Sequence, residues 1–287
     1  MSYFSMGYWV LGLAAVVSMV GALVGLVCVR QSTESVTAKF RLVWLAAAAV
    51  SIGGIGTWLA IFVSMLGVAP GDGGQIRYEV ARLVVAGVIA VSSTLAALLV
   101  LGGRPLVPRL AGAGLIMGVG MSAMLFVAMA GIHVQGVVRT AWWSITVAAV
   151  LAIGTATATL WFLLQRRPVS VLVAAAVLYA VGMLGMHYVR LAGVSVELEP
   201  GSVPPPGEDL FAFLVPMFVL GMLSLAVPIT AVLVTPDRRA QPAAAPATRA
   251  VPSGASVPSG PGMPSGPGGH DRAFDAGETM VIGAPRF

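Results

Sequence analysis

Seven apolar stretches, each about 20 residues long or longer, dominate this chain. A hydrocarbon core of about 30 Å is crossed by about 20 helical residues, so each stretch is long enough to span a bilayer. Backbone groups that meet lipid must bond within their own segment, which favours a helix in every case. The predicted fold class is therefore all-α, a bundle of seven transmembrane helices. The expected spans are residues 7–29, 42–67, 82–102, 110–131, 141–164, 168–190 and 210–234.

The composition supports a membrane protein. Hydrophobic residues make up 58% of the chain and charged residues 9%, and the mean hydropathy is +0.94. Soluble domains carry about 25% charged residues. The net charge of +5 comes from basic residues scattered singly between apolar blocks, which builds no phosphate-binding stripe. The expected partner is the lipid bilayer, and no nucleic acid is expected.

Basic residues in the loops predict the orientation, because cytoplasmic loops carry an excess of Lys and Arg. Nine lie in the loops on one side and four on the other. The nine are Arg30, Lys39, Arg41, Arg104, Arg109, Arg166, Arg167, Arg238 and Arg239. The four are Arg77, Arg82, Arg139 and Arg190. We expect a multi-pass protein of a bacterial plasma membrane, with its N-terminus outside and its C-terminus in the cytoplasm.

The composition changes after Thr235. Residues 241–269 consist largely of Pro, Ala, Gly and Ser, which bury too little apolar surface to fold. We therefore divide the chain into a seven-helix membrane domain, residues 1–235, and a disordered cytoplasmic tail, residues 236–287. The end of the tail carries a short acidic and then apolar motif around Thr279. Such a motif on a flexible tether favours a cytoplasmic protein partner, and a phosphorylated Thr279 would suit an arginine-lined reader.

Three segments of the membrane domain align with one another. They are Ala60–Gly67, Met124–Gly131 and Met186–Gly193, and their starts are 64 and 62 residues apart. Each lies at the end of an even-numbered span, and all three ends face outward in the predicted orientation. Three helix-pair repeats are the simplest interpretation.

The third segment begins Met186-His187-Tyr188, and this motif resembles the MHYT domain of bacterial membrane sensors. The resemblance implies seven helices over residues 1 to about 235, with Met-His-Tyr motifs near the outer ends of three of them. It also implies a bound copper that senses a small diatomic gas or redox state. The second segment has Met124-Leu125-Phe126 and the first has Ala60-Ile61-Phe62 at the motif positions.

Copper is the expected cofactor, because thioether and imidazole groups suit Cu(I) and need carry no charge in lipid. His187 is the only histidine within an expected span, and an ionisable residue there is by default a functional hypothesis. His133 follows the fourth span and can stand in for a missing imidazole. The candidate metal ligands are His187, Met186, Met124, Met129, Met65 and His133. Methionine is also a common filler of apolar cores, so packing is the competing interpretation of each thioether.

Two geometric expectations follow from the alignment. The aromatic residues Phe62, Phe126 and Tyr188 are expected at one depth near the outer face, with Met65, Met124 and Met186 close by. Arg190 is expected to extend its charged end to the outer interface.

Other functions are weighed against the sensor. The main alternative is a degenerate MHYT scaffold that anchors or binds a partner without metal. A transporter is disfavoured because the spans hold no acidic or basic residue away from their ends. A retinal protein is excluded because the single lysine, Lys39, lies in a loop, and the single cysteine, Cys28, excludes a Cys-based zinc site. No nucleophile–base constellation or phosphate loop supports an enzyme.

Overall fold

The computed structural model describes residues 7–35, 37–68, 76–102, 106–134, 136–165, 168–197 and 206–234. Within them, seven helical spans are long and apolar enough to cross a membrane. The spans are α1 (Trp9–Glu34), α2–η1–α3 (Ala38–Met65), α4 (Val80–Leu101), α5 (Val107–Ala130), α6 (Trp142–Leu164), α7 (Val169–Ala192) and α8 (Leu210–Val234). The all-α prediction and the number of spans are confirmed, and their bounds lie within a few residues of those expected.

Local sequence signals fix several helix ends. The side chain of Thr37 accepts a hydrogen bond from the backbone nitrogen of Phe40 and so caps α2. Pro108 lies in the first turn of α5, where its missing N–H costs nothing. Gly131 and Gly193 are the C-caps of α5 and α7, and they are the closing glycines of the second and third aligned segments.

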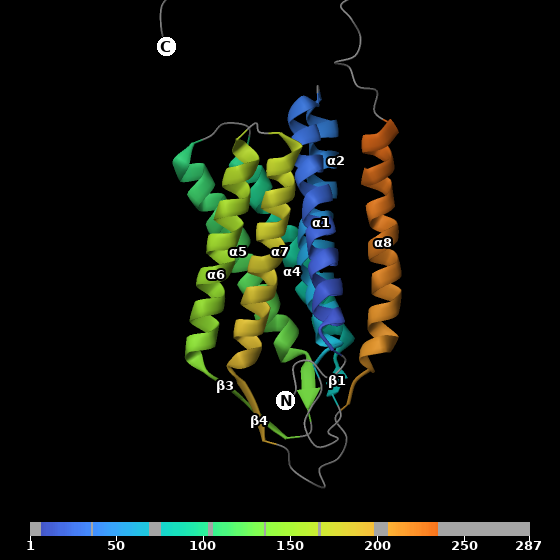
Figure 1. Cartoon of the computed structure of the whole chain (residues 1–287), viewed down its shortest axis with the longest axis vertical. Helices are drawn as coiled ribbons and strands as arrows, with labels where there is room; N and C mark the ends of the chain where they lie inside the picture. Colours follow the sequence, from blue (N-terminus) through green and yellow to red (C-terminus); the bar gives the residue numbers. More distant parts are fainter. Residues whose placement is uncertain are drawn as a thin grey trace, which may run out of the picture. The chain divides into compact units, whose positions relative to one another are not determined.

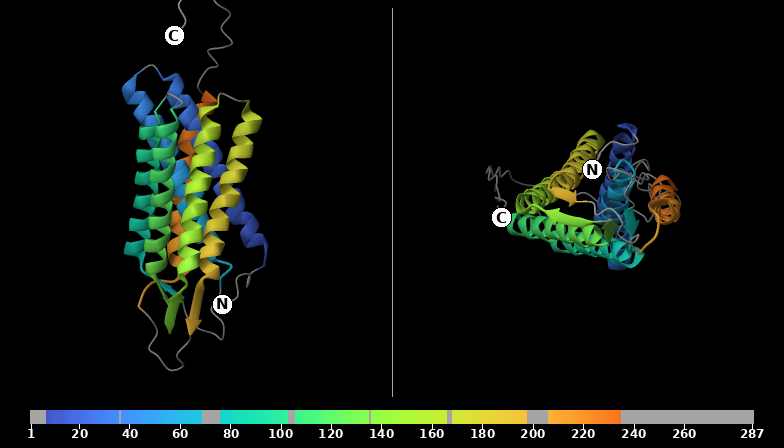
Figure 2. Two further views of the ribbon diagram at one scale, coloured as in Figure 1. Left: turned by 90° about the vertical axis from the view of Figure 1, so that its left-hand side faces the viewer. Right: turned by 90° about the horizontal axis from the view of Figure 1, so that it is seen from below.

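Six spans form a closed ring. Each packs against the next in the order α1, α2–η1–α3, α4, α5, α6 and α7, and α7 packs back against α1 (Figure 2). The helix α8 lies outside this ring, against η1 and α1, at the edge of the bundle in Figure 1. The three spans that carry the aligned segments are α2–η1–α3, α5 and α7, and they alternate with the other three around the ring. Their inward faces therefore meet in the ring interior.

Four short strands lie together at one end of the bundle, here called the strand end (Figure 1). They are β1 (Ile76–Tyr78), β2 (Ile132–Val134), β3 (Val137–Thr140) and β4 (Val194–Glu197). β1 pairs antiparallel with β2, and β3 pairs antiparallel with β4. Each sheet thus joins the residues just before one helix pair to those just after it: β1–β2 brackets α4 and α5, and β3–β4 brackets α6 and α7. The sequence analysis did not predict these strands.

The two strand-closed units match at an offset of 62 residues. Tyr78 pairs with Ile132 in the first sheet, and Thr140 pairs with Val194 in the second. The nitrogen of Glu79 donates to the carbonyl of Gly131 at 2.9 Å, and that of Ala141 donates to the carbonyl of Gly193 at 2.8 Å. The offset equals the spacing between the second and third aligned segments. Positions compared between α5 and α7 below are therefore structurally equivalent.

The second span departs from this pattern because its middle, η1 (Val50–Leu59), is a π-helix. The hydroxyl of Thr57 donates to the carbonyl of Ile52, five residues earlier, at 2.9 Å. α1 approaches η1 very closely here: a methyl group added at Gly21 would lie 2.5 Å from the backbone nitrogen of Gly56. Ser18 also donates to the carbonyl of Gly56 at 2.7 Å. π-helical segments are rare and occur often at functional sites.

Small residues hold the other ring helices together. An added methyl group at Gly120 would collide with Ser93 of α4, and one at Gly182 would collide with Thr155 of α6. Bulky apolar side chains such as Val88 and Val150 face outward instead. This is the usual arrangement in lipid, where association depends on close packing rather than on excluding water.

The chain divides into two units, Met1–Pro236 and Asp237–Phe287. The expected tail, including the motif around Thr279, lies outside the described residues.

Candidate functional site

The inward face of α7 concentrates polar and sulfur-containing side chains. Tyr179, Met183, Met186, His187 and Arg190 are all buried, and they follow one another at helical spacing. This face runs from the middle of the ring interior toward the strand end. It is the only part of the described spans that brings an imidazole into the interior.

The imidazole of His187 is fully buried, and neither ring nitrogen has a hydrogen-bond partner among the described residues. Its ring meets the ring of Tyr188 edge to face, with centroids 5.5 Å apart. Leaving a buried polar group without a partner costs about 1–3 kcal/mol. A side chain held in this way is suited to bind a group that the chain itself does not supply.

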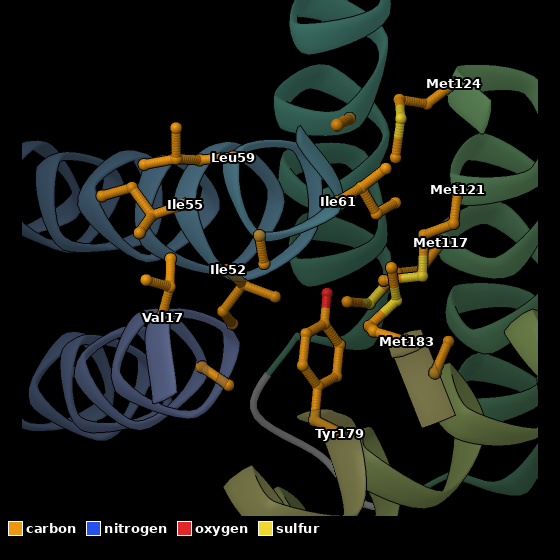
Figure 3. Packing of buried hydrophobic residues seen from close by; sticks show 14 of the residues in the cluster. Val17, Ile52, Ile55, Leu59, Ile61, Met117, Met121, Met124, Tyr179 and Met183 are labelled. Atoms are coloured by element: carbon orange, nitrogen blue, oxygen red, sulfur yellow. The ribbon is translucent and has the colours of Figure 1, made fainter. Parts of the chain in front are cut away.

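The thioethers of α5 line the interior opposite α7. Met117, Met121 and Met124 are buried at spacings of four and three residues, so they form one stripe on the helix. Figure 3 shows Met183 of α7 and Ile61 of α3 extending toward this stripe. Met183 and the α5 methionines belong to the same buried cluster as Met186.

A second, smaller cluster lies beside the first. Met65 and Leu191 are buried there with Val68, and Met129 and Tyr188 pack against them. The structure thus divides the predicted ligands: Met124 and Met186 belong to the main cluster and Met65 to the smaller one. Met129 and Tyr188 pack against both clusters.

His133 lies outside the helices, on β2. Its Nε2 is 3.3 Å from Oε2 of Glu79, which also forms an ion pair with Nε of Arg82 at 3.1 Å. Arg82 in turn donates to the carbonyl of Ala130. The imidazole of His133 therefore already has a partner in the strand-end loops.

The residues at the second motif position of the three aligned segments are all buried, as the alignment predicts for equivalent positions. Ile61, Leu125 and His187 are all at most 2% exposed. The first motif positions are buried as well. Only the third segment places a metal-binding side chain at the second position.

The expected convergence of the aromatic residues is wrong for Phe126, which is 59% exposed on the outer surface of α5. Its counterpart Phe62 is buried because α8 covers that side of the second span. Phe62 and Phe213 of α8 meet edge to face with centroids 5.8 Å apart, and Trp58 packs against both. The third motif position therefore does not line the interior in α5.

The expectation for Arg190 is also wrong. Its side chain is 6% exposed, so it is buried in the bundle instead of extending to the interface. Arg190 lies three residues after His187, and residues at this spacing are neighbours on one helix face.

The sequence analysis missed Tyr179 and Thr57, whose hydroxyl groups contact each other across the ring interior. Thr57 uses its own proton toward the carbonyl of Ile52, so Tyr179 donates to Thr57. A tyrosine in the middle of an apolar span is the signal that would have found this pair, because a buried tyrosine hydroxyl requires a partner.

Within the described residues, no group of three or more His, Cys, Asp or Glu side chains is arranged to hold a metal ion. Any metal in the interior would have to use thioethers together with one imidazole. That donor set is soft, and it suits Cu(I) better than Zn²⁺ or Mg²⁺.

Residues 118–176 match the family model MHYT, described as a bacterial signalling protein N terminal repeat. The match begins shortly before Met124 and ends before Met186, so it covers the second half of α5, all of β2, β3 and α6, and the start of α7. It therefore corresponds to one period of the aligned segments. No curated protein and no solved structure matches the chain.

Proposed function

We propose that this chain, whose residues 118–176 match the MHYT family model, is a membrane sensor of that family. Its receiving site would be the ring interior around His187. The membrane location and the signalling family are supported by the seven apolar helices and the family match. The finer proposal is that copper binds in this interior and responds to a small diatomic gas or to redox state.

The observation that carries this proposal is the state of His187. A fully buried imidazole with two unpartnered ring nitrogens lies on the same inward face as Met183 and Met186. The stripe of Met117, Met121 and Met124 belongs to the same cluster. Imidazole and thioether are donors that Cu(I) accepts, so the residues present fit this ion.

The proposed ligand set has His187 at its centre. Met186 and Met124, which occupy the first motif position of the third and second aligned segments, would be the next ligands. Met65 and Met129 would contribute from the neighbouring cluster. The proposed set omits the sequence candidate His133, because its Nε2 already contacts Glu79. Copper would supply a redox-active centre to which a diatomic gas can bind. The protein residues would hold the ion away from bulk water, in an interior lined by Met, Ile and Leu side chains.

Metal analysis of the detergent-purified protein tests the proposal. Loaded with Cu(I) and desalted, the wild type should retain copper, and His187→Ala should lose at least nine-tenths of it. His133→Ala is the matched control, because it removes an imidazole that already contacts Glu79. Equal retention by the wild type and His187→Ala would contradict a site at His187.

The alternative function is a scaffold that anchors or binds a partner without metal. The replacement of the other two motif histidines by Ile61 and Leu125 favours it, because both positions are buried and apolar. In that case the purified wild type should retain no copper. Under either function we propose no enzymatic activity.

We also propose that the strand end faces outward and that the C-terminal tail lies in the cytoplasm, where a partner would bind near Thr279. Peptides spanning residues 271–287, with and without a phosphate on Thr279, test this in a pull-down against a scrambled peptide. A tail that only tethers would capture nothing above the scrambled control.

A further inference from the structure

Arg190 carries a charge that the described chain does not balance. Its side chain is 6% exposed, and Nη1 is buried without a hydrogen-bond partner among the described residues. Arginine stays protonated in proteins, so the charge cannot be removed by loss of a proton. An unpaired charge in a bundle interior is strongly unfavourable, which calls for a partner that the described residues do not provide.

The described acidic side chains do not fill this role. The carboxylate of Glu79 is engaged by Arg82 and His133. Glu34 ends α1 at the opposite end of the bundle from the strands, and Glu208 and Asp209 are exposed before α8. No ion pair joins Arg190 to any of them.

The positions that correspond to Arg190 in the other two aligned segments carry small side chains. They are Ser64 and Ala128, and both are buried. The hydroxyl of Ser64 donates to the carbonyl of Ile61 at 2.8 Å, so its proton is used within its own helix. The guanidinium therefore meets no acid at the equivalent positions of the ring.

A second unpartnered group lies one helical turn away from Arg190 on α7. His187 is three residues away on the same face of α7, and both of its ring nitrogens lack a partner. A neutral imidazole offers one N–H donor, and the guanidinium offers several. Two adjacent buried donors, one of them permanently charged, match an anion that accepts hydrogen bonds.

We propose that Arg190 and His187 bind a small inorganic monoanion in the ring interior near the strand end, with chloride as the probe. This goes beyond the proposed copper function and does not depend on it. A lipid phosphate could offer the same charge, but Arg190 is buried within the bundle, so a free ion fits better than a headgroup at the lipid surface.

The experiment measures thermal unfolding of metal-free, chelator-treated protein in a non-ionic sugar detergent. Chloride replaces gluconate at constant ionic strength and pH. Wild-type Tm should rise with chloride and saturate, by about 3 °C at a tenfold excess over Kd. Arg190→Gln should lose this response, and its Tm in gluconate should equal or exceed that of the wild type because the unpaired charge is gone. Arg109→Gln is the matched control, because it removes an exposed arginine and should keep the full response.

Arg190→Lys keeps the charge and covers the case in which Arg190→Gln fails to fold. Lysine lacks the planar fork, so half-saturation should need at least threefold more chloride. The proposal is overturned if the wild-type Tm shows no saturable rise with chloride, or if this rise persists in Arg190→Gln. It is also overturned if Arg190→Lys reaches half-saturation at the same chloride concentration as the wild type. Stabilisation by added anionic phospholipid but not by chloride would assign Arg190 to a lipid headgroup and would also overturn it. The copper result does not affect these outcomes, because the protein is metal-free.

Discussion

The hydroxyl group of Tyr179 on α7 donates to the hydroxyl group of Thr57 in the π-helix η1, across the interior of the ring. The two residues are 122 positions apart in the sequence. The contact links the helix that carries His187 to the span with the unusual winding.

Removing this bond should have a measurable but modest cost. Tyr179→Phe deletes the donor and leaves the bond from Thr57 to Ile52 intact. Hydrogen bonds between transmembrane helices are worth about 0.6 kcal/mol on average and up to about 1.7 kcal/mol. A double-mutant cycle of Tyr179→Phe with Thr57→Val, read from unfolding in a denaturing detergent, should give a coupling energy in this range. A coupling indistinguishable from zero would show that the bond adds no stability.

Glycine positions in α1 should differ sharply in their response to alanine. In Gly21→Ala the new methyl group would lie 2.5 Å from the nitrogen of Gly56 and 2.7 Å from the carbonyl oxygen of Ser51, both backbone atoms. Overpacking typically costs about 1–3 kcal/mol, and backbone cannot yield as a side chain can. Gly12→Ala is the control on the same helix, because nothing lies within 4 Å of its added methyl group. We expect Gly12→Ala to be neutral or stabilising in the same unfolding assay.

The paired strands can be tested by cross-linking, which also tests the orientation. Val138 and Val196 are direct partners in the β3–β4 ladder. Cysteines at directly opposed positions of antiparallel strands lie close enough for a disulfide. The double variant Val138→Cys/Val196→Cys should therefore oxidise in cells if the strand end faces the oxidising exterior. Val138→Cys with Thr140→Cys, two positions on one strand, is the control and should stay reduced. A double variant that forms the bond only after purification would place the strand end in the cytoplasm.

Tyr78 should make the stability of the protein sensitive to high pH. Burial raises the pKa of its phenol above the ordinary value of 10.0, and the charge of Asp209 raises it further. The folded state therefore keeps the phenol proton at a pH where the unfolded state loses it. Stability should fall as the pH rises above about 10. Tyr78→Phe should remove this component, so the loss of Tm between pH 9 and pH 11 (about one unit on either side of the ordinary pKa) should be smaller. An identical pH profile in the variant would contradict the assignment.

The sequence predicted the spans well because their signal is simple. A run of about 20 apolar residues is sufficient to indicate a membrane helix, and no packing detail is needed. The strands at the strand end have three or four residues each, too few for a periodic pattern. The π-helix η1 has no distinctive sequence pattern either, because its glycine and isoleucine residues are equally compatible with an α-helix.

The site was predicted in part, and the errors concern the direction in which side chains point. His187 was chosen by its chemistry and lies in the interior, as its place on α7 requires. Phe126 was aligned by residue type, but its burial depends on whether a seventh helix covers that face. Arg190 could have been placed inward, because its spacing from His187 follows the helical period. The partner of Tyr179 depends on a contact between distant segments, which no local pattern reports.

The strand pairs have a mechanical consequence. β1–β2 ties the start of α4 to the end of α5, and β3–β4 does the same for α6 and α7. The two helices within each pair therefore cannot slide lengthwise past each other without breaking the ladder that joins them. Rigid tilting or rotation of a whole pair leaves both ladders intact. A displacement of α7 that begins at His187 would therefore move α6 with it, and the two helices would tilt together about the β3–β4 sheet.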